Sequence, residues 1–291
     1  MKYSLVIFLV FLTAVGGYAQ RLVPFKSDST WGYKDEADTI RIAPQFQYAA
    51  RFIGGSAVVA KGGKLGAIGT DGRLLVPCKY EYLQPLDTTE YLFGFRAKYY
   101  GEHFMGVLSN ANNIKIPAEY NGINKQNNSY IVSINKDSII GESSIGDIRS
   151  MKSLYGLFNI NGKLLLPCKY NYIRWHNDSL LVLTKGDKNA LFDKNGEQLS
   201  GFDYMVFGNF IEGVAKARIG NKYGFIYPNG KLVVPVIFDS CANFANGYAL
   251  VGNNKKWGAI NKQGSIVVKL QYTYEMANAK VKKLPKVRQL K

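Results

Sequence analysis

The chain has 291 residues, and 47% of them are hydrophobic and 13% aromatic, a composition that excludes a disordered protein and supports a substantial core. Its 37 Lys and Arg residues outnumber its 21 Asp and Glu residues, so the formal net charge is +16 at pH 7. Two His and three Cys residues are too few for a zinc site or a disulfide framework. We therefore expect no metal, and we expect buried thiols at strand ends.

Residues 1–19 have the organisation of a secretory signal peptide. Lys2 supplies a positive start, Leu5 to Val15 form an apolar run, and small residues end at Ala19, so we expect cleavage between Ala19 and Gln20. The alternative is an uncleaved membrane anchor, but the run is shorter than the roughly 20 residues of a spanning helix. We expect an exported protein, located in the periplasm, at the cell surface or outside the cell, without a membrane span in the mature chain.

Residues 20–279 repeat one pattern seven times. With Trp257 as position zero, the equivalent residues lie 34 residues apart in most intervals, at Trp31, Leu65, Met105, Tyr155, Asn189 and Tyr223. The next residue is glycine in six copies and alanine in one, namely Gly32, Gly66, Gly106, Gly156, Ala190, Gly224 and Gly258. Fifteen residues after position zero every copy has an aromatic residue, from Phe46 to Tyr272. Such a period indicates a repeat architecture.

Each copy has the local signals of antiparallel strands. Seven residues after position zero stands a glycine such as Gly72 or Gly230, usually after Asn or Asp, which predicts a tight hairpin with positive φ at both central residues. A second hairpin is expected upstream, at Gly252 to Asn254 in the last copy. A fourth strand is expected between the aromatic residue and a Phe six residues later, as from Phe238 to Phe244.

The pattern resembles the WG repeat family of bacterial proteins. Trp or Tyr followed by Gly, a hairpin Gly, an apolar strand ending in Pro, and then Phe-x-x-Gly-x-Ala carry the resemblance, with the last motif at 210–215, at 244–249 and a third time at Phe52 with Gly55 and Ala57. Met105 and Asn189 depart from it at position zero. The resemblance implies an all-β repeat array, frequently exported, without an established general activity.

The fold class expected is therefore all-β, with seven antiparallel β-meanders of about 34 residues each. Continuous apolar triplets such as Leu74 to Val76 indicate sheets covered on both faces. A propeller-like closed array and an open β-solenoid both cover the two faces of each sheet. Residues 21–26 and 272–277 match parts of one further unit and could complete a blade, which favours the closed array.

The usual catalytic constellations are missing from the sequence. No phosphate loop or dinucleotide fingerprint is present, so no cofactor is expected, and Asp193 to Glu197 read as a hairpin turn rather than a calcium loop. The repeated aromatics at position zero and fifteen residues later are expected to pack one unit against the next. We therefore expect no catalytic residues and a non-enzymatic binding or scaffold protein for a protein or glycan partner. The alternative is a carbohydrate- or envelope-directed hydrolase that uses carboxylates in the array.

The positive charge is spread along the chain, with one concentration in a predicted basic C-terminal tail, residues 280–291. Loss of Lys2 with the signal would leave a formal charge of +15, enough for weak attraction to anionic envelope surfaces. No nucleic-acid-binding module is evident, so no dedicated nucleic-acid role is expected. We expect a monomer.

Two insertions indicate a candidate binding face. Residues 91–104 and 133–152 extend the same loop of consecutive copies, and insertions at one loop position gather on one face of a repeat array. The first carries aromatic and basic side chains typical of binding anchors, namely Phe93, Phe95, Arg96, Lys98, Tyr99, Tyr100 and His103. The second, with Gly141 and Gly146, is expected to form a mobile cover. The alternative is that surface loops merely tolerate insertion.

Overall fold

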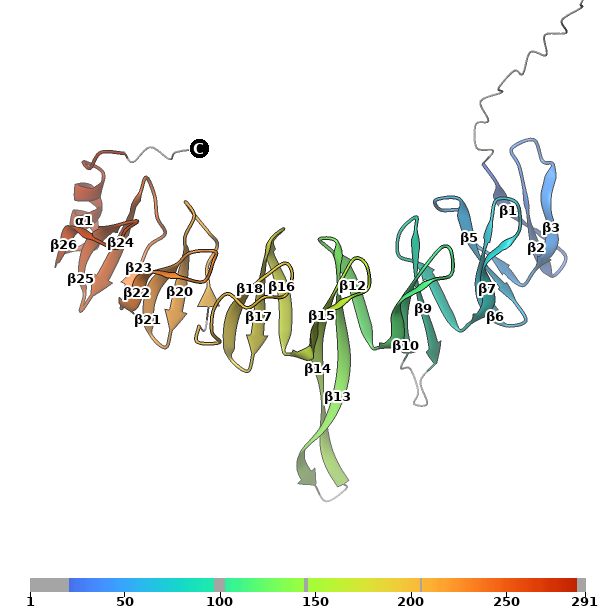
Figure 1. Cartoon of the computed structure of the whole chain (residues 1–291), viewed down its shortest axis with the longest axis horizontal. Coiled ribbons are helices and arrows are strands. Elements are labelled where there is room, and N and C mark those ends of the chain that lie inside the picture. Colours follow the sequence, from blue (N-terminus) through green and yellow to red (C-terminus); the bar gives the residue numbers. More distant parts are fainter. Residues whose placement is uncertain (1–20, 97–102, 144–145, 205, 287–291) are drawn as a thin grey trace, which may run out of the picture. The chain divides into compact units, whose positions relative to one another are not determined.

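The computed structural model describes residues 21–96, 103–143, 146–204 and 206–286 of the chain (Figure 1). The predicted signal peptide, residues 1–19, lies outside the described residues. The chain divides into two compact units. Unit 1 comprises the chain up to Lys98 together with Val107–Ile114, and unit 2 comprises Tyr99–Gly106 and Lys115–Lys291.

Unit 1 begins with a three-stranded sheet and a four-stranded sheet in simple meander order. The first contains β1 (Val23–Ser27), β2 (Thr30–Lys34) and β3 (Ile40–Phe46); the second contains β4 (Tyr48–Ala49), β5 (Ser56–Lys61), β6 (Lys64–Gly69) and β7 (Leu74–Tyr80). The boundary between the units passes through the next sheet, which contains β8 (Tyr82–Pro85), β9 (Glu90–Arg96), β10 (His103–Ser109) and β11 (Ile114–Tyr120).

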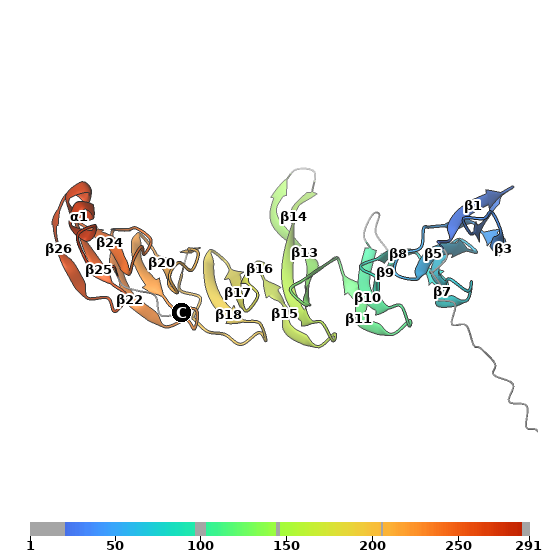
Figure 2. The same cartoon turned by 90° about the horizontal axis from the view of Figure 1, so that it is seen from above.

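Unit 2 continues with four more sheets, each again in meander order. They are β12 (Gly122–Gln126), β13 (Ser129–Ser143), β14 (Gly146–Asn159) and β15 (Leu164–Tyr170); β16 (Tyr172–Asn177), β17 (Leu180–Lys185) and β18 (Lys188–Asp193); β19 (Val206–Phe207), β20 (Ala215–Ile219), β21 (Lys222–Ile226) and β22 (Leu232–Phe238); and β23 (Ser240–Cys241), β24 (Tyr248–Asn253), β25 (Lys256–Asn261) and β26 (Ile266–Tyr272). Figure 2 shows the same succession from above. The all-β prediction and the fourth strand are thus confirmed for the described residues.

The glycine after position zero marks a β-bulge. Position zero pairs with the aromatic residue fifteen positions later, as in Tyr223 with Phe238, and the register shifts immediately afterwards. A Cβ atom on Gly224 would lie 2.6 Å from the carbonyl oxygen of Val234 in the next strand. The close approach expected from the sequence is therefore present, and the backbone at Gly224 stays outside the left-handed region.

The exception, Ala190, belongs to the sheet that lacks the closing strand. After Asp193 the described chain makes only isolated bridges, Phe192 with Gln198 and Asn189 with Tyr204, in place of a ladder. The sheet therefore keeps three strands. Ala190 is fully buried in a core cluster, and the chain that follows bonds to Asn189 and Leu191 without forming a ladder like the one beside Gly224.

The hairpin glycine has a different role from the one expected. Gly72 has φ of 78°, but the preceding Asp71 does not have positive φ, so the prediction of two such residues at this turn was wrong. The Gly72 amide donates to the Gly69 carbonyl at 3.0 Å, which is a type I turn followed by one left-handed residue. Two consecutive positive φ values occur instead at the other hairpin, for example at Asn254 and Lys255.

The repeated aromatic residues are not equally buried. The aromatic fifteen residues after position zero lies in the core in most sheets, as Tyr80 does with 2% exposure, whereas all seven position-zero residues are only half-buried. The expected packing role is thus met by the aromatic residue fifteen positions after position zero. The residue at position zero meets it only in part. Contacts between successive sheets also involve the Phe of the Phe-x-x-Gly motif, since Phe244 packs edge-to-face on Phe225 at 4.8 Å.

The C-terminal segment forms a helix where the sequence favoured a strand. Helix α1 (Tyr274–Val281) starts at Thr273, whose hydroxyl accepts the Met276 amide at 3.3 Å as an N-cap. Figures 1 and 2 both show α1 against the last sheet, where Ala277 is fully buried. Residues 272–277 therefore do not supply a strand that could complete a blade with residues 21–26, and closure of the array stays a prediction without that support.

Candidate functional site

The insertions expected to form a binding face extend the same hairpin of consecutive sheets. In the first, Phe93 is 2% exposed and packs on Tyr80 at 5.0 Å, while Phe95 is 42% exposed. The Arg96 amide donates to the Glu81 carboxylate, which also pairs with a lysine. Lys98, Tyr99 and Tyr100 lie outside the described residues, and His103 begins β10. The structure thus brings the two phenylalanines together, with Phe93 in the core.

The second insertion is a paired ribbon rather than an irregular loop. Strands β13 and β14 pair from Ser129 with Asn159 to Ser143 with Gly146, with one register shift after Ile139. Their outer parts extend beyond β12 and β15, the other two strands of the sheet (Figure 1). The described residues of the second insertion therefore form a long β-hairpin and not the mobile cover that we expected.

A groove in unit 2 offers a more complete site. It lies between the β12–β15 sheet and the β16–β18 sheet and has a volume of about 480 Å3. We call it the Trp175 groove, and it is lined by Gly122, Ile123, Asn124, Gln126, Ile131, Ser133, Tyr155, Tyr172, Ile173, Arg174 and Trp175. Strand β12 and strand β16, each the first strand of its sheet, supply most of this lining.

Gly122 distinguishes this groove from the equivalent place in other copies. It stands seventeen residues after position zero, where four other copies have a tyrosine, namely Tyr48, Tyr82, Tyr172 and Tyr274. A Cβ atom on Gly122 would already lie 2.6 Å from Ser133 Oγ. At the last sheet the equivalent tyrosine, Tyr274, packs on Trp257 at 5.0 Å. The equivalent contact in the Trp175 groove is that between Tyr155 and Tyr172.

Aromatic rings form the walls of the Trp175 groove. Tyr155 and Tyr172 meet edge-to-face with ring centroids 5.9 Å apart, and Tyr172 is 52% exposed. The indole Nε1 of Trp175 is buried and has no hydrogen-bond partner among the described residues. An unmade hydrogen bond of this kind costs about 1–3 kcal/mol.

The polar side chains of the groove offer donors and acceptors and one positive charge. Asn124 and Gln126 bring amides, Ser133 brings a hydroxyl, and Arg174 brings the guanidinium, whereas no carboxylate belongs to the lining. Burial, followed by the charge of Arg174, lowers the pKa of the adjacent His176, so this imidazole is neutral at pH 7. The groove is therefore suited to a neutral or anionic polar ligand with an apolar face.

The cysteines are poor nucleophiles. Burial raises the pKa of Cys168 and of Cys241 to about 11, and it raises the pKa of Cys78 as well. All three are free thiols, so they are protonated at neutral pH. Among the described residues no group of three His, Cys, Asp or Glu side chains is placed to hold a metal ion.

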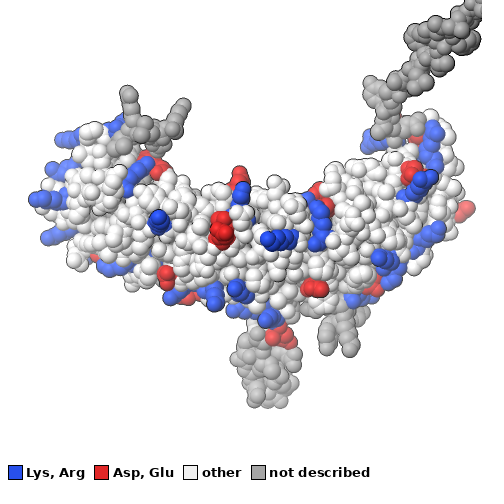
Figure 3. All heavy atoms as spheres, in the orientation of Figure 1, with Lys and Arg blue, Asp and Glu red and all other residues white. Residues whose placement is uncertain are grey.

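Charges are mixed over the visible surface. Figure 3 shows Lys and Arg side chains interspersed with Asp and Glu on the described part of one face, without a single continuous basic patch. The predicted basic tail begins inside α1, where Lys280 lies 4.8 Å from the ring centroid of Tyr272. Tyr248 Oη donates to the Pro285 carbonyl at 3.1 Å, so the chain stays attached to the last sheet that far. No helix within the described ranges is long and apolar enough to cross a bilayer.

Successive antiparallel meanders with a half-buried Trp or Tyr followed by a bulge glycine define this protein as an all-β repeat protein. The family model described as WG containing repeat matches residues 31–64, 155–188, 191–223, 223–257 and 257–274, together more than half of the chain. The chain belongs to the WG repeat family.

Comparisons with other proteins add little beyond the family. No curated protein matches the chain. A structure described as a eukaryotic initiation factor is 12% identical, covers 87% of each chain and has a TM-score of 0.32. Apo AztD from Citrobacter koseri is 12% identical over 87% of this chain and 82% of its own, with a TM-score of 0.29. A protein of unknown function from Bacteroides caccae is 14% identical over 86% and 93%, with a TM-score of 0.24.

Sequence reasoning missed the Trp175 groove although two of its signals are visible in the sequence. The glycine at position 122 breaks a column of tyrosines, and Trp175 is one of three tryptophans. The other two, Trp31 and Trp257, are repeat residues, so Trp175 is the tryptophan that the repeat does not explain.

Proposed function

We propose that this WG repeat protein is an exported, non-enzymatic binding protein and that the Trp175 groove binds a glycan segment. The observation that carries the proposal is the open groove beside Gly122, walled by Tyr155, Tyr172 and Trp175. Export rests on the signal-peptide pattern of residues 1–19. The role as a binding protein rests on the groove.

The lining of the groove has the chemistry that binds a glycan. A pyranose ring has an apolar C–H face that packs on aromatic rings and hydroxyl groups that both donate and accept, which fits the amides of Asn124 and Gln126. A peptide is the alternative occupant, because β12 and β16 are edge strands of their sheets.

The test is binding of the purified full chain to a panel of glycans, followed by titration calorimetry with the strongest one. Tyr172→Leu removes one aromatic wall of the groove and should reduce affinity at least about tenfold. Tyr155→Leu should have a similar effect because it removes one aromatic wall.

The matched control is Tyr223→Leu, which changes the same repeat position in another sheet, at a residue outside the groove lining. Folded Tyr172→Leu and Tyr155→Leu proteins that bind as the wild type does would exclude the groove as the site. Product release from the bound glycan, lost on substitution of one carboxylate, would replace the proposal with the hydrolase alternative.

A further inference from the structure

A second groove of unit 2, separate from the Trp175 groove, lies between the closing strands of the last two sheets, β22 and β26. It has a volume of about 580 Å3, and we call it the Ile237 groove. Its lining includes Val234, Ile237, Lys256, Ile266, Lys269 and Leu270.

Ile237 is an apolar residue at a repeat position that is polar in every other copy. Fourteen residues after position zero the other six copies have Gln45, Lys79, Glu119, Lys169, Asp203 and Gln271. Ile237 is nevertheless 53% exposed, and Ile266, on the other sheet that lines the groove, is 60% exposed. The repeat does not require an apolar side chain at the position of Ile237. Exposed apolar surface at a groove indicates a ligand that covers it.

Two lysines lie on the face of the last sheet that meets β22. Ile260 of β25 packs with Val234 of β22, and Lys256 lies on the same face as Ile260 because side chains alternate along a strand. On β26, Val268 packs on the opposite face in the cluster with α1, so the next residue, Lys269, is directed toward β22. Strands β25 and β26 thus each bring one exposed ammonium group to the rim of the groove.

Lys256 keeps its repeat position but lacks the carboxylate that accompanies it elsewhere. In two other copies the lysine before position zero pairs with the residue seventeen positions later, namely Lys64 with Glu81 at 2.8 Å and Lys222 with Asp239 at 2.5 Å. In the last copy that residue is Thr273, the N-cap of α1. Lys256 forms no ion pair with a described residue.

Lys269 is a second departure from the repeat in the same groove. Four other copies have a proline at its position, Pro77, Pro117, Pro167 and Pro235. Among the described residues Lys269 has no ion pair either. The carboxylate of Asp239, next to the lining, is occupied by Lys222 and by the Asn254 amide at 2.8 Å. No carboxylate belongs to the lining itself, so the groove combines apolar surface with two unpaired positive charges.

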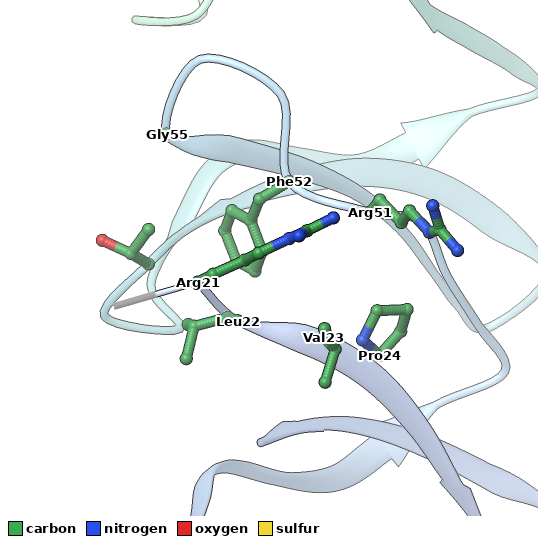
Figure 4. Close-up of a pocket in the computed structure, with 8 residues that line it drawn as sticks. Arg21, Leu22, Val23, Pro24, Arg51, Phe52 and Gly55 are labelled. Carbon is green, nitrogen blue, oxygen red and sulfur yellow. The ribbon is translucent and has the colours of Figure 1, made fainter. Parts of the chain in front are cut away.

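The cavity between the first two sheets of unit 1 lacks this combination. Figure 4 shows Arg21 and Arg51 in its lining, with the Arg51 side chain directed away from the turn at Gly55. None of the residues that line it is an exposed large apolar side chain. The Ile237 groove is therefore the better candidate for a ligand that is both apolar and charged.

We propose that the Ile237 groove binds a single-chain anionic amphiphile, an unbranched acyl chain that ends in a carboxylate. The chain lies over Val234, Ile237 and Leu270, and the carboxylate pairs with Lys256 and Lys269. The volume of about 580 Å3 falls within the range of small-molecule sites. The site is independent of the Trp175 groove and would remain if the glycan proposal failed.

The test is titration calorimetry of the full chain with decanoate below its micelle concentration. Decanoate should bind, and decyltrimethylammonium, which has a chain of the same length and a positive head group, should bind at least about tenfold more weakly. The double substitution Lys256→Gln with Lys269→Gln should weaken decanoate binding about tenfold or more. Ile237→Gln should also weaken it, because it replaces the apolar side chain by the residue type of Gln45 and Gln271.

The matched controls are Lys231→Gln, just before β22, and Leu232→Gln, the first residue of β22, which are both exposed and outside the lining. Thermal melting checks that each variant is folded. The proposal would be overturned by absence of decanoate binding, by equal affinity for decyltrimethylammonium, or by equal weakening in the controls. Full affinity in the folded Ile237→Gln protein or in the folded double lysine variant would overturn it as well.

Discussion

At the scale of single residues, the repeat is held in place by a few positions with strict geometric needs. The residue seven positions after position zero has positive φ in every copy; it is Gly in five of them, and Asp38 and Asn112 in the other two. These are the residue types that adopt the left-handed region at low energetic cost. The polar residue sixteen positions after position zero meets a second geometric need. In four copies its side chain accepts a backbone amide of the following sheet at 2.7–2.8 Å, namely at Gln47, Asn121, Asn171 and Asp239.

The bulge glycines give the residue-scale prediction. Gly224→Val should lower the free energy of unfolding by about 1–3 kcal/mol, because the new side chain would collide with the backbone at Val234 and Pro235. Ala190→Val should cost less, since its sheet lacks the closing strand at this point. Chemical denaturation of both variants measures the difference. Equal and small losses would show that the glycine column is not a packing constraint.

At the scale of elements, the last sheet is finished by a helix rather than by another sheet. Leu250, Ala259 and Val268 form an apolar cluster with Ala277 of α1, and Val281 and Leu284 pack against it. Repeat arrays need such a cap because an uncovered terminal sheet exposes apolar surface. Thr273 caps the start of the helix, and Glu275 in the first turn and Lys280 in the last turn complement the helix dipole. The repeat pattern by itself does not predict this replacement of a strand by a helix.

Removal of the helix gives the element-scale prediction. A chain that stops after Thr273 should melt at a lower temperature and self-associate, because the cluster around Leu250 and Val268 would lose its cover. Analytical ultracentrifugation and thermal melting measure both effects. A chain that stops after Lys286 is the control, since the contacts of α1 and the Tyr248 bond to Pro285 remain. A monomeric and equally stable chain ending at Thr273 would contradict the capping role.

At the scale of the whole molecule, charge and specific binding should separate in their response to salt. The formal charge of +16 is spread over many side chains, so attraction to anionic membranes is expected to be weak and screened at ordinary ionic strength. The Trp175 groove relies on aromatic rings and amides, with Arg174 as its one charged lining residue among those described.

The whole-molecule prediction follows from this difference. Association with anionic lipid vesicles should fall steeply between low and physiological salt, whereas glycan affinity should change little. Vesicle sedimentation and calorimetry at two salt concentrations measure the two responses. Vesicle binding that persists at high salt would indicate a dedicated lipid site rather than diffuse attraction.

By itself, the sequence determined the repeat period, the all-β class, the strand order within each sheet and the column of glycines, because each follows from local backbone needs that recur every 34 residues. Only the tertiary structure decided which positions are open. Gly122 and Gly224 are both glycines in the sequence, yet one meets a serine side chain at the Trp175 groove and the other a neighbouring strand. Side chains that meet across two sheets are far apart along the chain, so local pattern does not determine what they leave unfilled.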